Sequence, residues 1–69
     1  MTDGYTVYLR YGCHLCEAMT TRLRQRGIAF TEIDIDADED LRREYNERVP
    51  VLTRDGEFVC QYFLDEGLL

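Results

Sequence analysis

The stretch Gly12-Cys13-His14-Leu15-Cys16 places two cysteines three positions apart, between an apolar segment and a segment with helical periodicity. At the start of a helix, the positive end of the helix dipole and unpaired backbone N–H groups stabilise a thiolate, which is the reactive form of cysteine. A cysteine three residues further on lies on nearly the same helix face, where it can attack a mixed disulfide formed at the first. The spacing therefore predicts Cys13 as the attacking thiolate and Cys16 as the resolving thiol.

The segments on either side of this stretch predict a strand and a helix. Residues 5–9 are rich in β-branched and aromatic side chains and predict a buried first strand. From Cys13 to Arg26, apolar residues recur at spacings of three and four, which is the pattern of one helix face. Gly27 then provides a C-terminal stop. The two cysteines therefore open a helix that follows a strand.

Residues 29–36 form the next regular segment. Their side chains alternate between two faces, which predicts a second strand. A right-handed crossover through the intervening helix would make this strand parallel to the first. The acidic residues of the stretch 36–40 then supply N-cap candidates for a second helix. We expect this helix to run to about residue 47, with Leu41 and Tyr45 four positions apart on its buried face.

The pair Asp55-Gly56 separates two β-prone runs, residues 50–54 and 57–63. Because a two-residue hairpin turn needs positive φ angles, Asp-Gly at this place predicts a β-hairpin. Residues 64–69 are enough for one turn of helix. The predicted order is β-α-β-α-β-β, an α/β fold, in a single domain of residues 1–69.

The composition fits a small globular domain. The 69 residues are 45 % hydrophobic and 32 % charged, and the formal net charge is −6. This charge repels phosphates, so no nucleic-acid partner is expected. The sequence has no run of about 18 apolar residues and no basic leader at residues 1–4, so we expect no membrane association and a cytoplasmic location. The odd number of cysteines, three, argues against a disulfide framework.

Three local features together resemble the thioredoxin fold and, within it, the small glutaredoxin-like proteins. These features are residues 8–17 (YLRYGCHLCE), residues 48–52 (RVPVL) and the Asp55-Gly56 turn. The resemblance implies a four-stranded mixed sheet in the order 2-1-3-4, with strands three and four antiparallel to strand one. It also implies a cis peptide bond before Pro50, packed against the cysteine pair.

The resemblance and the local charges together define the expected substrate-binding residues. Arg10 stands where glutaredoxins often carry a lysine, and with His14 it adds positive charge beside Cys13. A cis bond before Pro50 would expose the backbone of Val49 to an extended peptide or to glutathione. From the residues alone, a trans proline at the start of an edge strand is an equal alternative. The expected set is Arg10, Tyr11, His14, Val49 and Pro50.

The C-terminal stretch departs from the family that the chain resembles. Glutaredoxins carry Gly-Gly and an acidic residue shortly after strand four, which hold glutathione, whereas residues 60–63 here read CQYF. Glutathione therefore stays an open alternative as cosubstrate. The C-terminal helix is truncated, which would leave Phe58, Tyr62 or Phe63 exposed as a candidate partner surface.

The predicted activity is thiol–disulfide exchange by a monomer, without a prosthetic group. The substrate would be a protein disulfide or a low-molecular-weight thiol, and an external thiol would restore the cysteine pair.

Two other classes of function stay open at this point. Cys13, Cys16, Cys60 and His14 have the composition of a zinc site, although Cys60 lacks a neighbouring ligand, and no metal is expected. An iron–sulfur cluster shared between two chains is a weaker variant. The second class is a redox-inert adaptor that uses the Val49-Pro50 region to bind a partner. Cys60 itself fits a small strand residue better than a third redox thiol.

Overall fold

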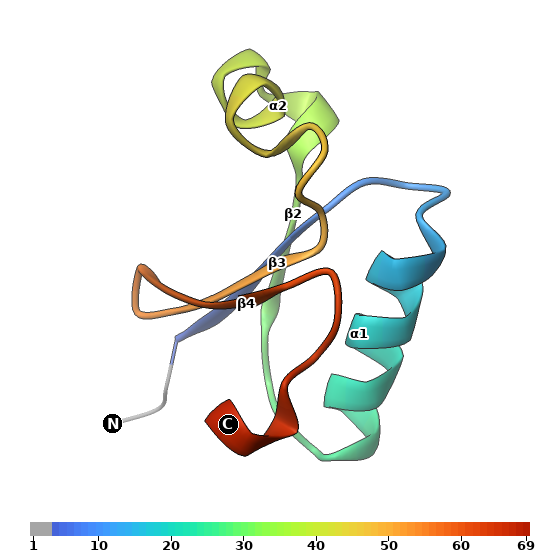
Figure 1. Ribbon diagram of the computed structural model, residues 1–69, viewed down its shortest axis with the longest axis vertical. Coiled ribbons are helices and arrows are strands. Elements are labelled where there is room, and N and C mark those ends of the chain that lie inside the picture. Colours follow the sequence, from blue (N-terminus) through green and yellow to red (C-terminus); the bar gives the residue numbers. More distant parts are fainter. Residues whose placement is uncertain (1–3) are drawn as a thin grey trace.

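A four-stranded sheet with helices on both faces organises the chain (Figure 1). The computed structural model describes residues 4–69. The expectation of no leader at residues 1–4 therefore falls mostly outside the described residues. The elements are β1 (Tyr5–Leu9), α1 (His14–Gln25), β2 (Thr31–Asp34), the 3-10 turn η1 (Ile35–Ala37), α2 (Glu39–Tyr45), β3 (Val51–Arg54), β4 (Glu57–Gln61) and the 3-10 turn η2 (Glu66–Leu68). The strand order β2-β1-β3-β4 confirms the prediction.

The strand directions correct one part of the predicted topology. β1 is parallel to β2 and antiparallel to β3, while β3 is antiparallel to β4. β4 therefore runs in the same direction as β1, and the expectation that it would be antiparallel to β1 was wrong. The reason is the tight turn at Asp55 and Gly56, whose φ angles of 53° and 86° reverse the chain between β3 and β4.

The second strand is shorter than the predicted segment 29–36. Its pairing with β1 spans Thr31 to Asp34 and stops where β1 itself ends at Leu9. The Asp34 side chain then accepts a hydrogen bond from the Asp36 backbone N–H at 2.9 Å, which starts η1. Ile35 turns into the interior and is fully buried. A local cap and a core contact thus replace the last part of the expected strand.

Two further boundaries are set by local backbone geometry. α2 begins after Asp38, whose carboxylate accepts hydrogen bonds from the backbone N–H groups of Asp40 and Leu41, and it ends two residues before the expected boundary. β4 ends at Gln61 because Tyr62 adopts a positive φ of 65°, which an extended strand does not allow.

The two helices lie on opposite faces of the sheet. Val7 and Leu9 of β1 pack with Met19 and Leu23 of α1 in the main buried cluster. Tyr8, which points to the other face because side chains alternate along a strand, stacks on Tyr45 of α2 with ring centroids 4.7 Å apart. None of the α2 residues is fully buried, so the expected buried face of that helix, Leu41 and Tyr45, is only half-buried.

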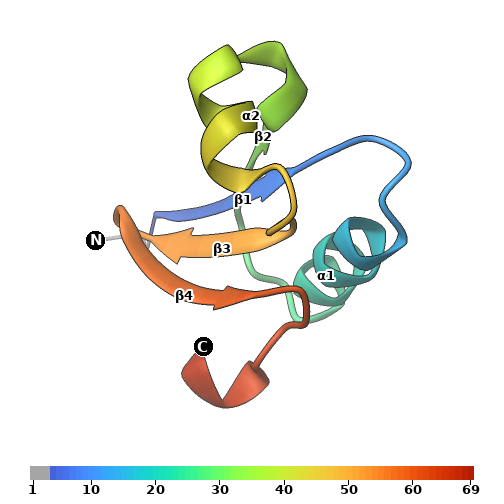
Figure 2. The same ribbon diagram turned by 45° about the horizontal axis from the view of Figure 1, so that its top comes forward.

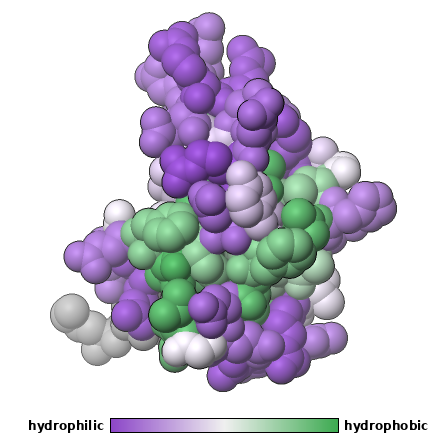
Figure 3. Space-filling model, viewed as in Figure 1, coloured by the Kyte–Doolittle hydropathy of each residue, from purple (hydrophilic) through white to green (hydrophobic). Residues whose placement is uncertain are grey.

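The turn of helix at the C-terminal end leaves aromatic side chains exposed, as expected. Figure 2 shows this turn lying below β4, away from α2. Phe58, Tyr62 and Phe63 are exposed. Figure 3 shows an apolar band across the face that carries β4 and the segment after it.

Candidate redox site

The turn after β1 positions the first cysteine at the beginning of α1. Gly12 has a φ of 80°, a left-handed conformation that glycine adopts without the steric cost of a side chain. Cys13 follows in an extended conformation and is the N-cap residue of α1. The helix therefore starts directly at the nucleophile predicted from the sequence.

The two cysteine side chains differ in exposure and in hydrogen bonding. The Sγ of Cys13 accepts a hydrogen bond from the Cys16 backbone N–H at 3.1 Å, and Cys13 is half-buried. Cys16 is only 2 % exposed and belongs to the main buried cluster. Both cysteines carry free thiols. A negative charge on Cys13 would thus be stabilised by a backbone N–H and by the positive end of the helix dipole.

Burial, together with the hydrogen bond to the Cys13 side chain, raises the pKa of Cys16 from 9.0 to about 12. The backbone and the positive charge of Arg10 act in the opposite direction. Cys16 therefore keeps its proton at neutral pH. Its sulfur can act as a nucleophile only after that proton has left.

The raised pKa of Cys16 predicts a loss of stability at alkaline pH. Above about pH 9 the unfolded chain releases this proton while the folded protein keeps it up to about pH 12, so the free energy of unfolding of the reduced protein should fall across this range. The slope from one group is at most about 1.4 kcal/mol per pH unit. Urea titrations at several pH values above about pH 9, within this range, should show a steeper decline for the wild type than for Cys16→Ala.

Tyr45, whose pKa is also raised by burial, contributes equally to both proteins in that comparison. Equal slopes in the wild type and in Cys16→Ala would contradict the assignment of the proton to Cys16.

The structure gives the backbone geometry and the exposure of the expected substrate-binding residues. The Val49-Pro50 peptide bond is cis, as predicted, and Pro50 is buried. Val49 and Cys13 pack against the same buried cluster. Tyr11 is 80 % exposed, and His14, the first residue of α1, is also exposed. These placements leave the substrate-binding roles as predictions.

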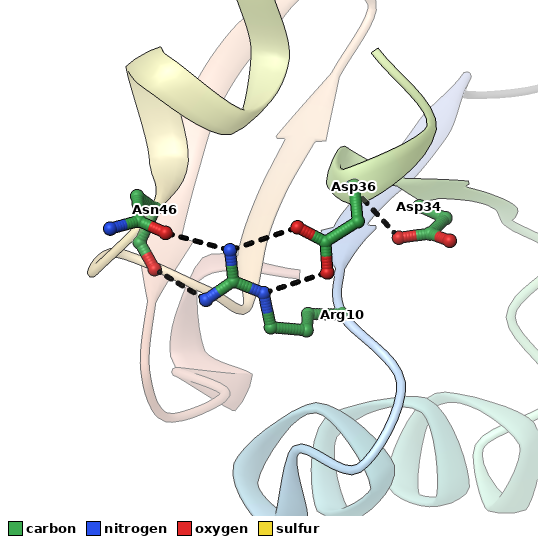
Figure 4. A network of polar contacts seen from close by, with 4 residues as sticks. All are labelled: Arg10, Asp34, Asp36 and Asn46. Atoms are coloured by element: carbon green, nitrogen blue, oxygen red, sulfur yellow. Dashed lines mark hydrogen bonds and ion pairs between the residues drawn. The ribbon is translucent and has the colours of Figure 1, made fainter. Parts of the chain in front are cut away.

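Arg10 makes contacts that its position in the sequence did not indicate. Its guanidinium points to Asp36 and Asn46, which are 26 and 36 positions away (Figure 4). No local spacing rule connects such residues.

Tyr62, which the sequence placed in the last strand, instead supports the segment before β3. Its backbone N–H donates to the Pro50 carbonyl oxygen at 2.9 Å and its hydroxyl donates to the Glu47 carbonyl oxygen at 3.0 Å. This residue therefore holds both ends of the segment that contains the cis peptide bond. The sequence did not indicate this role, because it depends on a left-handed backbone conformation that tyrosine rarely adopts.

A cavity of about 220 Å³ opens beside Cys16. It lies between the turn after β1, the first turns of α1 and β2, and its wall includes Cys16, Glu17, Thr20 and Glu32. A second hollow, of about 380 Å³, runs along α2 and has no cysteine in its lining. Of these two hollows, the first is thus the one that has a cysteine in its wall.

Within residues 4–69, no three side chains of His, Cys, Asp or Glu are grouped so that they could hold a metal ion. The four residues considered for a zinc site are therefore not gathered into one. No helix in the described part of the chain has the length and the apolar character needed to cross a membrane.

Comparisons with known proteins agree with the fold. The family model described as Glutaredoxin-like domain (DUF836) matches residues 5–69. No curated protein matches the chain.

Solved structures of other proteins share the fold of this chain. Protein Ne2328 from Nitrosomonas europaea is 42 % identical, with a TM-score of 0.84 over 99 % of this chain and 87 % of that one. Protein XcR50 from X. campestris is 35 % identical, with a TM-score of 0.80 over 93 % of this chain and 87 % of that one. A malarial protein, 17 % identical with a TM-score of 0.57 over 88 % and 79 % of the two chains, shares the fold alone. The predicted glutaredoxin-like thioredoxin fold is confirmed.

Proposed function

Because the chain belongs to the glutaredoxin-like domain family, we propose that it is a thiol–disulfide oxidoreductase in which Cys13 attacks and Cys16 resolves. The observation that carries this proposal is the contrast between the two thiols. Cys13 is partly accessible and accepts a backbone hydrogen bond at the start of α1, whereas Cys16 is buried and its pKa is raised to about 12. This difference in exposure favours Cys13 over Cys16 as the sulfur that a substrate disulfide would reach first.

The reaction proceeds by two exchanges. In the first, the Cys13 thiolate attacks a disulfide R–S–S–R′, a Cys13–S–S–R bond forms, and R′S⁻ leaves and takes a proton from solvent. In the second, Cys16 loses its proton and attacks the Cys13 sulfur, so that RS⁻ leaves and a Cys13–Cys16 disulfide remains. Two electrons pass from the cysteine pair to the substrate. An external thiol couple then reduces the pair.

The first exchange prepares the second. Hydrogen bonding and charge interaction with Cys13 both contribute to the raised pKa of Cys16. In a mixed disulfide the Cys13 sulfur cannot become charged, so its charge interaction with Cys16 is absent, while burial, the largest cause of the raised pKa, remains. We therefore expect Cys16 to lose its proton more readily in the mixed disulfide than in the reduced protein.

The mechanism uses no prosthetic group, and its substrates would be protein disulfides or small disulfides in the cytoplasm. A monomer contains both cysteines and is sufficient for each step. Glutathione is one candidate for the reducing thiol.

Equilibration in redox buffers tests the proposal. The purified protein is incubated in dithiol buffers of graded poise, quenched by alkylation and measured by mass. We expect a loss of two protons confined to Cys13 and Cys16, with a defined midpoint, while Cys60 is alkylated only after unfolding because it is buried. A pair that stays reduced in every buffer, or that releases metal on oxidation, would overturn the redox function.

A further inference from the structure

The guanidinium of Arg10 is occupied on two edges by protein oxygens (Figure 4). Its Nε and Nη2 donate to the two carboxylate oxygens of Asp36 at 2.9 and 3.0 Å. Its Nη2 also donates to the side-chain Oδ1 of Asn46 at 2.7 Å, and its Nη1 donates to the backbone carbonyl oxygen of Asn46 at 3.2 Å. A guanidinium grips a planar carboxylate with such paired donors. Both pairs are already engaged within the protein.

These contacts join the segments that build the redox site. Arg10 follows β1 and precedes Cys13 by three residues, while Asp36 lies in η1. Asn46 follows α2 in the segment that leads to the cis peptide bond at Pro50. One side chain therefore ties the segment that carries the nucleophile to the segment that carries the cis bond.

The charges around Arg10 are balanced. Arg10 interacts electrostatically with Asp34 and Asp36, and Asp36 interacts in turn with Arg42. Hydrogen bonding between the two partners raises the pKa of Arg10 and lowers the pKa of Asp36, so both stay charged at neutral pH. Cys13 lies within electrostatic reach of the same guanidinium. An incoming anion would therefore meet a neutralised arginine beside the thiol.

Asp36 is also held in place to make this contact. Its backbone N–H donates to the Asp34 carboxylate at 2.9 Å, which fixes the start of η1. A ligand carboxylate would have to displace a partner tethered to the same chain, whose effective concentration is on the order of millimolar or higher. The carboxylate of a small acidic thiol therefore gains little binding free energy by displacing Asp36 from Arg10.

We propose that Asp36 and Asn46 withhold Arg10 from anionic ligands, so that the site selects disulfides whose neighbouring groups are neutral or cationic. This inference rests on the proposed redox function and specifies its substrate class. Asp36 is then the residue that sets specificity, and Arg10 is a positioning residue. The net charge of −6 acts in the same direction because it repels small anions.

Binding of a non-reactive ligand tests the inference without any redox step. S-methylglutathione keeps the carboxylates of glutathione but has no free thiol, and its binding can be followed by shifts of backbone amide resonances in NMR spectra. We expect no saturation of the wild type at millimolar ligand. Asp36→Asn, which keeps the shape and removes the charge, should bind about five- to tenfold more tightly. Added salt should weaken this gain.

Two further variants identify the group responsible. Asp40→Asn makes the same change in net charge at an exposed position outside the Arg10 network, and we expect it to behave as the wild type. Arg10→Gln in the Asp36→Asn background should remove the gain, because the guanidinium is then absent. Equal binding by Asp36→Asn and Asp40→Asn would overturn the inference. Saturable binding by the wild type that Arg10→Gln abolishes would also overturn it, and this comparison does not require a folded Asp36→Asn protein.

Oxidation rates connect the binding result to substrate choice. The rate with oxidised glutathione, divided by the rate with uncharged bis(2-hydroxyethyl) disulfide, should rise in Asp36→Asn and stay unchanged in Asp40→Asn. An unchanged ratio in Asp36→Asn would contradict the substrate class. If neither disulfide oxidises the wild type while the titrations behave as expected, the redox function fails and the assignment of Arg10 stands.

Discussion

Replacing Cys13 with serine should reduce disulfide exchange to the uncatalysed rate, whereas replacing Cys16 with serine should trap the protein as a mixed disulfide. Cys13 is a half-buried cysteine at the N-terminus of α1, and its loss removes the group that we expect to attack. Cys16→Ser leaves that attack intact but removes the sulfur that displaces the product. Mass measurement after incubation with bis(2-hydroxyethyl) disulfide distinguishes an unmodified chain from a stable adduct.

Cys60→Ala is the matched control for these variants. Cys60 lies in β4 and is buried, and we expect exchange by this variant to match the wild type. A mixed-disulfide adduct on Cys13→Ser would reverse the roles assigned to the two cysteines. The absence of an adduct on Cys16→Ser would refute Cys13 as the attacking thiol.

Leu23→Ala should destabilise the domain more than any surface change. Leu23 is fully buried in the cluster that α1 shares with β1 and β3. Removing three buried carbons and leaving a cavity costs about 2–5 kcal/mol. Because a domain of this size has a small core, that cost is a large part of its total stability. Thermal unfolding followed by circular dichroism should show a midpoint at least about 10 °C lower than that of the wild type.

Leu68→Ala provides the control for the core substitution. Leu68 is 50 % exposed in the C-terminal turn, so the same truncation leaves little cavity, and we expect a change below about 1 kcal/mol. Equal effects of the two substitutions would show that α1 does not form the core of the domain.

Local features of this chain could be predicted because their causes lie within a few residues. Helical periodicity and the turn at Gly12 place Cys13 at the start of α1. Asp55-Gly56 produces the hairpin because both residues adopt the positive φ angles that the turn requires. The boundaries of the second strand were less predictable, since Asp34 leaves the alternating pattern to cap η1 and Ile35 turns into the core.

The sequence by itself thus determined the cysteine pair, the order of elements and, through its resemblance to glutaredoxin-like proteins, the strand order and the cis bond before Pro50. Only the tertiary structure decided the surroundings of that pair. The raised pKa of Cys16 depends on burial by elements that meet after folding. The contacts of Arg10 with Asp36 and Asn46 depend on β1, η1 and α2 ending side by side. Such contacts join residues distant in the chain, so no local pattern encodes them.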